Sequence, residues 1–377
     1  MINPDNNCTT CKACIQICPK KCIGIDKFNK ISINSTSCIN CGACERVCQI
    51  TRPLTYFTPS MIYAAYNKNQ QELIRSSSGG IGGLLIRICL YSNFKVFSAS
   101  YNDDTLPVIQ EVIPSNIEKA LKSKYCYADI NDSYIKCRNY LKKGEKVLFI
   151  ALPCQIGGLR LFLNKNYENL FCVDLFCHGA PSAAELQMHL NYKNSKKKKI
   201  IDVQFRDKSV SKWGDYCFGY RYSDGSISVG PALCDYYFSN FIKGTFFREC
   251  CYKCKYAKFE RIGDVSIGDY WHITPKHLDA STNGISAVLI NNEKGKVLWQ
   301  LISKYCEYEE GTKKSVEYAT HAVLHPMKRP DTYMSHIKKT QEEYNQMAKK
   351  YERTIIQMFR LLRFKFSKCY LFNIIKR

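Results

Sequence analysis

The chain has 377 residues, 22 of them Cys, and its 55 Lys and Arg against 33 Asp and Glu give a formal net charge of +22. This length allows two or three units with cores of their own, and a 45% content of hydrophobic residues excludes a disordered or collagen-like chain. The start, MINPDNNC, lacks the pattern of a secretory signal, and no apolar stretch approaches the roughly 18 residues of a transmembrane helix. We therefore expect a cytoplasmic protein whose reduced thiols serve metal or redox chemistry.

Nine of the cysteines fall within the first 48 residues, and eight of them form two copies of a C-x2-C-x2-C-x3-C run. In the bacterial ferredoxin pattern, the first three cysteines of a run hold one cubane cluster and the fourth holds the other. The runs therefore predict two 4Fe-4S ligand sets: Cys8, Cys11, Cys14 and Cys48 for the first, and Cys38, Cys41, Cys44 and Cys18 for the second. A pair of zinc knuckles is the alternative, but zinc ligands usually come in pairs with long spacers between them.

Three residues next to these runs stand apart from the ligand pattern. Cys22 lies outside both ligand sets, and we interpret it as a small buried hydrophobe. Pro19 follows the first run as the pattern requires, whereas Gln49 takes the equivalent place after the second run. This departure changes the local chain direction and leaves the predicted ligands unchanged.

Globular patterning begins after this module, which ends near residue 55. A Ser/Gly loop over 76–83 precedes an apolar run typical of a helix, but it lacks the third glycine and the preceding strand of a dinucleotide-binding fingerprint. In chain order the next predicted elements are strands over 94–101 and 107–113, a short helix opened by a capping box over 115–118, and a helix over 131–142. Later strands are predicted over 200–206, 216–222, 263–271 and 285–291, and helices over 232–243 and 293–303.

Two continuous apolar runs, 146–152 and 170–176, read as buried parallel strands joined by a helical crossover near 157–165. Cys154 and Cys177 then follow the carboxyl ends of these strands, where open α/β sheets bind their ligands. Cys251 and Cys254 form a C-x2-C pair further along. Together the four thiols predict a third 4Fe-4S site, with a four-cysteine zinc site as the alternative.

These residues resemble a known family, the coenzyme F420 hydrogenase/dehydrogenase beta-subunit flavoproteins, over roughly residues 60–310. The resemblance is carried by SSSGGIGG, SKY, LPCQIGGLR, DLFCHGAPS, FRDK with the following Trp213, CYKC and RIGDVSIGDYW. It implies an FAD beside a 4Fe-4S cluster held by the four thiols of the third site. It also implies FAD contacts from Ser78, Gly79, Gly80, Lys124 and Tyr125, and a flavin or substrate cleft with Lys124, Arg206, Lys208 and Asp269 as candidate catalytic residues.

The expected fold is α+β, with a dicluster ferredoxin domain (1–55) before an α/β domain whose sheet is mostly parallel or mixed (60–145 and 146–345) and a basic amphipathic helix (346–377). The expected function is that of an iron-sulfur flavoprotein oxidoreductase, because clusters carry single electrons whereas a flavin exchanges two electrons with an organic substrate or coenzyme. The alternative is a non-catalytic electron-transfer subunit or redox partner in a larger complex, for example in polysaccharide biosynthesis.

The positive charge raises the question of partners. No motif combining aromatic and basic residues points to nucleic acid, so we expect a redox partner protein or a small-molecule substrate. Residues 353–377 carry seven basic and no acidic residues among apolar ones. This pattern is typical of a helix on the anionic inner face of a membrane, and equally of a helix docked on the body or on a partner subunit.

Overall fold

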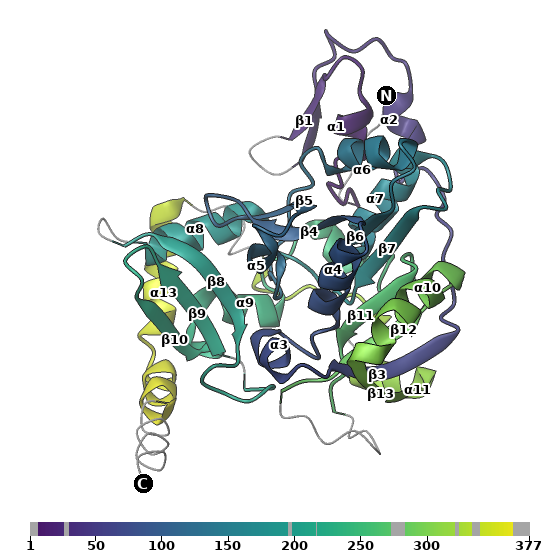
Figure 1. The fold of residues 1–377 in the computed structure, drawn as a ribbon. Helices are drawn as coiled ribbons and strands as arrows, with labels where there is room; N and C mark the ends of the chain where they lie inside the picture. The colour runs from purple at the N-terminus through teal and green to yellow at the C-terminus, as the bar shows by residue number, and fades with distance from the viewer. Residues whose placement is uncertain are drawn as a thin grey trace.

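The computed structural model describes residues 7–25, 30–194, 198–215, 217–272, 283–320, 324–333 and 340–364. Its N-terminal unit is a small layer at the top of Figure 1, built around a two-stranded antiparallel hairpin in which Ile23 pairs with Ile33. The elements of this unit are α1 (Ala13–Ile17), β1 (Ile23–Ile25), β2 (Ile31–Ile33) and α2 (Ala43–Arg46). Two short helices and a hairpin leave most of this unit as loops, which carry all of its cysteines except Cys14 in α1 and Cys44 in α2.

An eight-stranded mixed sheet forms the body, in the order β13-β3-β12-β11-β7-β6-β4-β5. Strands β4, β6, β7 and β11 run parallel, and the pairs at both ends of the sheet are antiparallel. The strands are β3 (Met61–Asn67), β4 (Lys95–Tyr101), β5 (Pro107–Val112), β6 (Val147–Ala151), β7 (Leu170–Leu175), β11 (Val265–Asp269), β12 (Ser286–Ile290) and β13 (Cys306–Glu310). The expectation of a mixed sheet is thereby confirmed.

Strands β6 and β7 form the predicted parallel pair, with Val147 opposite Leu170. Both are buried along almost their whole length, as their continuous apolar sequences require. The crossover helix α7 (Pro153–Leu163) begins earlier than the predicted 157–165. Pro153 explains the early start, because proline fits the first turn of a helix, where its missing N–H is not needed.

Helices cover both faces of this sheet. On one face α4 (Ile81–Tyr91) and α10 (Glu293–Ile302) pack together over a large aliphatic cluster, and on the other α6 (Ser133–Lys142) packs beside α7. The shorter helices are α3 (Gln70–Arg75), α5 (Ile117–Ala120) and α11 (Lys313–Ala319). The capping box predicted at 115–118 does not form, because the Asn116 side chain instead accepts a hydrogen bond from the Ile113 N–H at the end of β5.

A separate antiparallel sheet, β10-β9-β8, lies on the left of Figure 1 with three helices against it. The elements of this sheet and its helices are α8 (Ala183–Lys193), β8 (Ile200–Asp207), β9 (Cys217–Tyr222), β10 (Ile227–Pro231), α9 (Tyr236–Lys243) and α13 (Gln341–Glu352). Three 3-10 turns occur along the chain: η1 (Ala232–Cys234), η2 (Glu249–Lys253) and η3 (Ser303–Tyr305).

Strands β3, β10 and β13 were not predicted from the sequence. Strand β3 also corrects the statement that no strand precedes the Ser/Gly loop, although α3 lies between them.

The C-terminal segment differs from the single helix predicted from residue 346. Helix α13 begins at Gln341 and ends at Glu352, and a second helix covers 355–364. Residues 365–377 of the predicted helix lie outside the described residues. None of the described helices has the length and apolar character needed to cross a membrane.

Candidate functional site

The N-terminal unit brings the eight predicted ligand cysteines together in two hollows. Cys8, Cys11, Cys14 and Cys48 line one hollow, and Cys18, Cys38, Cys41 and Cys44 line the other. In both hollows three thiols come from one run and the fourth from the other run, as the ferredoxin pattern requires. We call the hollow that contains Cys8 the first hollow and the hollow that contains Cys18 the distal hollow.

Cys22 also belongs to the distal hollow. It is buried, as expected of a small hydrophobe, but its Sγ lies 3.4 Å from the Sγ of Cys18 and it lines the same hollow. The sequence reasoning assigned it no place near the ligands. Residues 18–22 form the turn between α1 and β1, and this turn brings the two thiols together.

A third cavity of about 270 Å³ collects the four remaining predicted ligands, and we call it the third site. Cys154 lies in the first turn of α7, Cys177 follows the end of β7, and Cys251 and Cys254 come from η2 and the residue after it. Burial raises the pKa of the Cys154 thiol to about 12, so a metal centre bound there must displace its proton. Cys250, which lies outside the predicted ligand set, lines this cavity as well.

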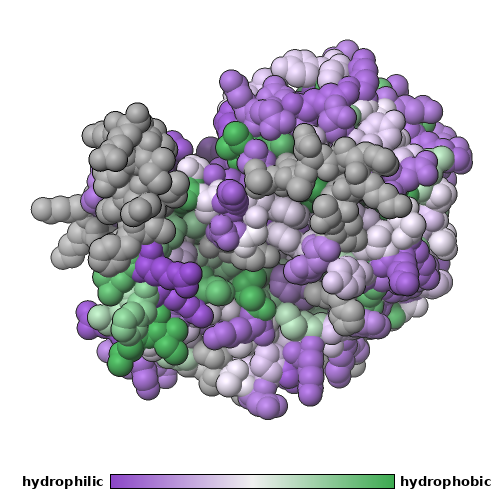
Figure 2. Space-filling view, turned by 90° about the horizontal axis from the view of Figure 1, so that it is seen from below, coloured by the Kyte–Doolittle hydropathy of each residue, from purple (hydrophilic) through white to green (hydrophobic). Residues whose placement is uncertain are grey.

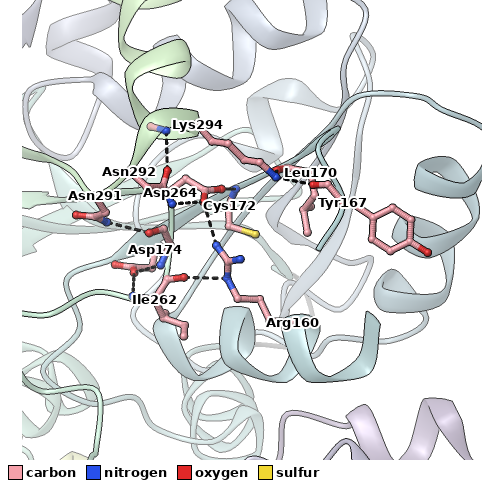
Figure 3. A network of polar contacts seen from close by, with 12 residues as sticks. Arg160, Tyr167, Leu170, Cys172, Asp174, Ile262, Asp264, Asn291, Asn292 and Lys294 are labelled. Atoms are coloured by element: carbon pink, nitrogen blue, oxygen red, sulfur yellow. Dashed lines mark hydrogen bonds and ion pairs between the residues drawn. The ribbon is translucent and has the colours of Figure 1, made fainter. Parts of the chain in front are cut away.

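A buried polar network fixes the segments that carry these thiols (Figure 3). The Asp174 carboxylate in β7 accepts hydrogen bonds from Arg261 and from the Ile262 and Gly263 N–H groups. Asp264 accepts from the Cys172 N–H at 2.6 Å and from Arg160 of α7 at 3.0 Å. These hydrogen bonds join residues 261–264 to β7, which leads into Cys177, and to α7, which carries Cys154.

The first hollow adjoins the third site, and the two share Thr9, Gln49 and Ile50 in their linings. The Gln49 Nε2 donates to the Cys154 carbonyl at 3.0 Å and to Thr9 Oγ1 at 2.8 Å. The Gln49 Oε1 accepts from the Tyr256 hydroxyl. The residue that replaces the expected proline thus contacts both of these cysteine-lined sites.

Close packing of α7 against the Cys11 loop depends on glycine. A Cβ on Gly158 would lie 2.8 Å from both the Cβ and the Sγ of Cys11, and one on Gly157 would overlap the Tyr256 hydroxyl. These glycines belong to the LPCQIGGLR stretch, so the sequence offered a signal that was not used. They allow the N-terminal unit to approach the third site.

A fourth cavity, of about 260 Å³, opens on the other side of the third site, and we call it the Ser/Gly cavity. Leu152, Cys177, His178 and Gly179 line both cavities. The N-terminus of α4 also lines this cavity; Gly80, its N-cap, has a φ of +79° that favours glycine, and no side chain caps the free N–H groups. Uncapped helix N–H groups of this kind suit a phosphate or another anion.

Five of the residues that the resemblance assigned to flavin or substrate line this cavity: Ser78, Gly80, Lys124, Tyr125 and Asp269. Burial lowers the pKa of Lys124 to about 7, while its Nζ donates to the Leu121 carbonyl at 2.8 Å. Tyr125 stacks on Phe241 with ring centroids 4.5 Å apart.

Gly79, Arg206 and Lys208 do not line the cavity but hold the groups that do. Gly79 donates its N–H to Ser286 and accepts from the Asn67 N–H. Arg206 donates to the Tyr125 hydroxyl at 3.0 Å and pairs with Asp269 at 3.4 Å. Lys208 donates to the carbonyls of Leu73, Ser78 and Asn283, and burial lowers its pKa to about 8. Arg206 and Lys208 therefore support the wall of the cavity, and Lys208 anchors the Ser78 loop directly.

The thiols and the Ser/Gly cavity can be compared with what 4Fe-4S clusters and an FAD require. Each cluster needs four thiolates, and each of the three cysteine-lined sites presents at least four thiols. Within the described residues, no group of three or more His, Cys, Asp or Glu side chains is gathered around a point where a single metal ion could be held. The number of thiols at each cysteine-lined site fits a cluster, and the uncapped N-terminus of α4 at the Ser/Gly cavity fits an anionic cofactor.

Comparisons with known proteins bear on the part of the chain that carries the third site. Residues 144–314 match the family described as the C terminus of the coenzyme F420 hydrogenase/dehydrogenase beta subunit. Among solved structures, a chain from the xenon-derivatised F420-reducing NiFe hydrogenase complex of Methanosarcina barkeri is 19% identical, with a TM-score of 0.47, over 71% of this chain and 88% of that one. The comparison with curated proteins gives no match. Residues 144–314 are therefore similar to the C-terminal part of the beta subunits of coenzyme F420 hydrogenases and dehydrogenases.

Proposed function

We propose that this protein is an iron-sulfur flavoprotein oxidoreductase that passes electrons between three 4Fe-4S clusters and an FAD, which exchanges two electrons with an organic substrate or coenzyme. The clusters would be held by the four predicted thiols of each cysteine-lined site, and the FAD by the Ser/Gly cavity. The division into units 1–55, 60–145, 146–345 and 346–377 is part of this proposal. When bound, the clusters supply one-electron steps and the flavin supplies the conversion to a two-electron step.

The observation that carries the proposal is the sequence of adjoining cavities. The distal and first hollows share one small core, the first hollow and the third site share three lining residues, and the third site and the Ser/Gly cavity share four. Cys177 lines both the third site and the Ser/Gly cavity. A continuous row of this kind, from four thiols at one end to an anion-binding cavity at the other, is what an electron path requires.

The chain's own residues have defined roles in this proposal. Ser78, the N–H groups at the start of α4 and Lys124 would bind the FAD phosphates, because helix N-termini and lysines both attract anions. Lys208 and Arg206 would hold the Ser78 loop, Tyr125 and Asp269 in place. The Asp269 Oδ1 is buried without a hydrogen-bond partner and lines the cavity, so it is the candidate group for handling a substrate proton.

The proposal is tested by reducing the anaerobically purified full chain with a one-electron donor while following the flavin absorbance. We expect Cys251→Ser/Cys254→Ser to retain the eight irons of the N-terminal unit and to slow flavin reduction. Unchanged flavin reduction in this variant would contradict the proposed path. If the wild-type flavin is reduced but the isolated chain then reduces no added organic acceptor, the alternative of a non-catalytic electron-transfer subunit is correct.

The C-terminal helix supports a proposal about location. Helix α13 is docked on the body through buried Tyr344 and Ala348, whereas 355–364 exposes apolar side chains, with Ile355 at 72% and Phe359 at 67%. Figure 2 shows hydrophobic surface gathered at the left of this face of the molecule. Arg360 and Arg363 accompany these side chains. We propose that this segment contacts an anionic membrane surface from the cytoplasmic side.

Vesicle co-sedimentation tests this location. The full chain should sediment with phosphatidylglycerol vesicles and not with phosphatidylcholine vesicles, and Phe359→Asp should abolish the binding. Ile201→Asp, at an exposed apolar position in β8, is the matched control and should bind as the wild type does. If the wild type fails to sediment with either kind of vesicle, the membrane proposal is wrong.

A further inference from the structure

Arg248 lies between the first hollow and the third site and contacts both. Its side chain lines the third site together with the four predicted ligand thiols. Its Nη1 donates to the Thr9 carbonyl at 2.6 Å and to the Thr10 Oγ1 at 2.9 Å, in the loop between Cys8 and Cys11. The guanidinium also lies over the Tyr127 ring, 3.4 Å from its centroid. No sequence motif pointed to this residue.

The third site's own segments fix the position of Arg248. Its N–H donates to the Ala180 carbonyl at 3.2 Å, just after the Cys177 loop, and its carbonyl accepts from the Cys251 N–H at 2.8 Å. The backbone of Arg248 is thus tied to two of the segments that carry ligand thiols. Its side chain reaches the loop between Cys8 and Cys11 in the N-terminal unit, which also carries ligand thiols.

The charge of Arg248 is not matched by a carboxylate. Arg160, Arg206 and Arg261 each form an ion pair with an aspartate, at 3.0, 3.4 and 2.5 Å. Arg248 forms no such pair with any Asp or Glu of the described residues, and its Nε is buried without a hydrogen-bond partner. A buried charge is costly unless an opposite charge compensates it. The groups around it that can supply negative charge are the thiols of the two adjoining sites.

We infer that Arg248 is the shared counter-charge of the clusters at the first hollow and the third site, and that it raises the reduction potentials of both. The inference rests on the proposed function, since it requires clusters at these sites. Each cluster becomes more negative by one charge when it accepts an electron, so a nearby cation stabilises the reduced form. One cation between two clusters therefore favours reduction of both.

The test is an EPR-monitored redox titration of the anaerobically purified full chain, with iron counted per chain. Arg248→Gln removes the charge and keeps hydrogen-bond donors, whereas Arg248→Lys keeps the charge. We expect Arg248→Gln to retain its iron, to shift the potentials of the first and third clusters to lower values, and to leave the distal cluster unchanged. Arg248→Lys should stay close to the wild type, and Arg75→Gln, at an exposed position, is the control.

Several results would overturn the inference. Unshifted potentials in a fully loaded Arg248→Gln variant would show that the charge does not act on the clusters, and an equal shift of all three would indicate a general structural effect. If Arg248→Gln loses iron, the Arg248→Lys variant distinguishes the explanations. Retained iron and unshifted potentials in Arg248→Lys would support the role of the charge, whereas iron loss in both variants would contradict it. Absence of clusters from the wild type would instead refute the proposed function.

Discussion

The N-terminal unit and the eight-stranded sheet are stabilised in different ways. The core of the unit consists of Cys14, Cys22, Cys44 and two isoleucines, with further cysteines packed around them. The sheet is covered on one face by 22 buried residues, most of them aliphatic or aromatic, and a second large cluster covers the other face. Apolar burial alone can hold the sheet together, whereas a unit of about 50 residues with a thiol core needs bound groups. The same residues that would carry electrons in the unit also have to hold it folded.

Removal of iron should separate the two regions most clearly. Treatment of the reduced protein with an iron chelator should abolish hydrogen-exchange protection over 7–55, because metal-binding energy in such units is folding energy. The amides of β6 and β7 should remain protected, since their contacts involve no ligand. If both regions lost their hydrogen-exchange protection equally, or if both kept it, the N-terminal unit would not depend on bound iron more than the sheet does.

Within the sheet, the Asp174–Arg261 pair should be the most sensitive polar contact. Both side chains are fully buried and paired at 2.5 Å, so Asp174→Ala leaves an uncompensated charge and should lower the free energy of unfolding by about 3–5 kcal/mol. Glu118→Ala breaks exposed ion pairs with Arg75 and Arg87 and should cost about 1 kcal/mol or less. Denaturant unfolding measures both, and equal effects would show that burial of the pair is unimportant.

The junction of the two regions should respond to Gly158→Ala. The added methyl group would lie 2.8 Å from Cys11 and 2.9 Å from the Tyr134 hydroxyl, so the Cys11 loop must shift. Overpacking of this kind costs about 1–3 kcal/mol, against a gain of about 1 kcal/mol in helix propensity. Faster hydrogen exchange in the Cys11 loop, with β11 unaffected, is the expected result. Unchanged exchange would mean that the unit does not rely on this contact.

The smallest effect concerns Lys124 and depends on pH. Its folded pKa of about 7 lies below the unfolded value of 10.5, so between these values unfolding takes up a proton and stability rises with pH. At pH 7 and below, where Lys124 is charged in both states, Lys124→Met should therefore gain stability relative to the wild type, and the difference should shrink toward pH 10. Lys119→Met, at an exposed position, should show no such trend in denaturant unfolding. A difference independent of pH would contradict the burial of the Lys124 charge.

The sequence predicted the parts of the molecule that depend on local spacing. The two cysteine runs, the apolar strands β6 and β7 and the thiols that follow them lie as their patterns required. The roles of Gln49 and Arg248 could not be predicted, because each depends on contact between segments some 100 to 240 residues apart. Strand β3 was missed for the same reason, since its place between β12 and β13 is set by pairing partners far along the chain.

We propose that three clusters and one flavin are arranged in a row, and counting these groups per chain tests the proposal. Iron, acid-labile sulfide, zinc and flavin should be determined per chain after anaerobic purification. Because each cubane cluster holds four irons and four sulfides, we expect about 12 iron atoms, about 12 sulfides and one FAD per chain. Zinc in place of iron at Cys154, Cys177, Cys251 and Cys254, or the absence of flavin, would contradict the proposal.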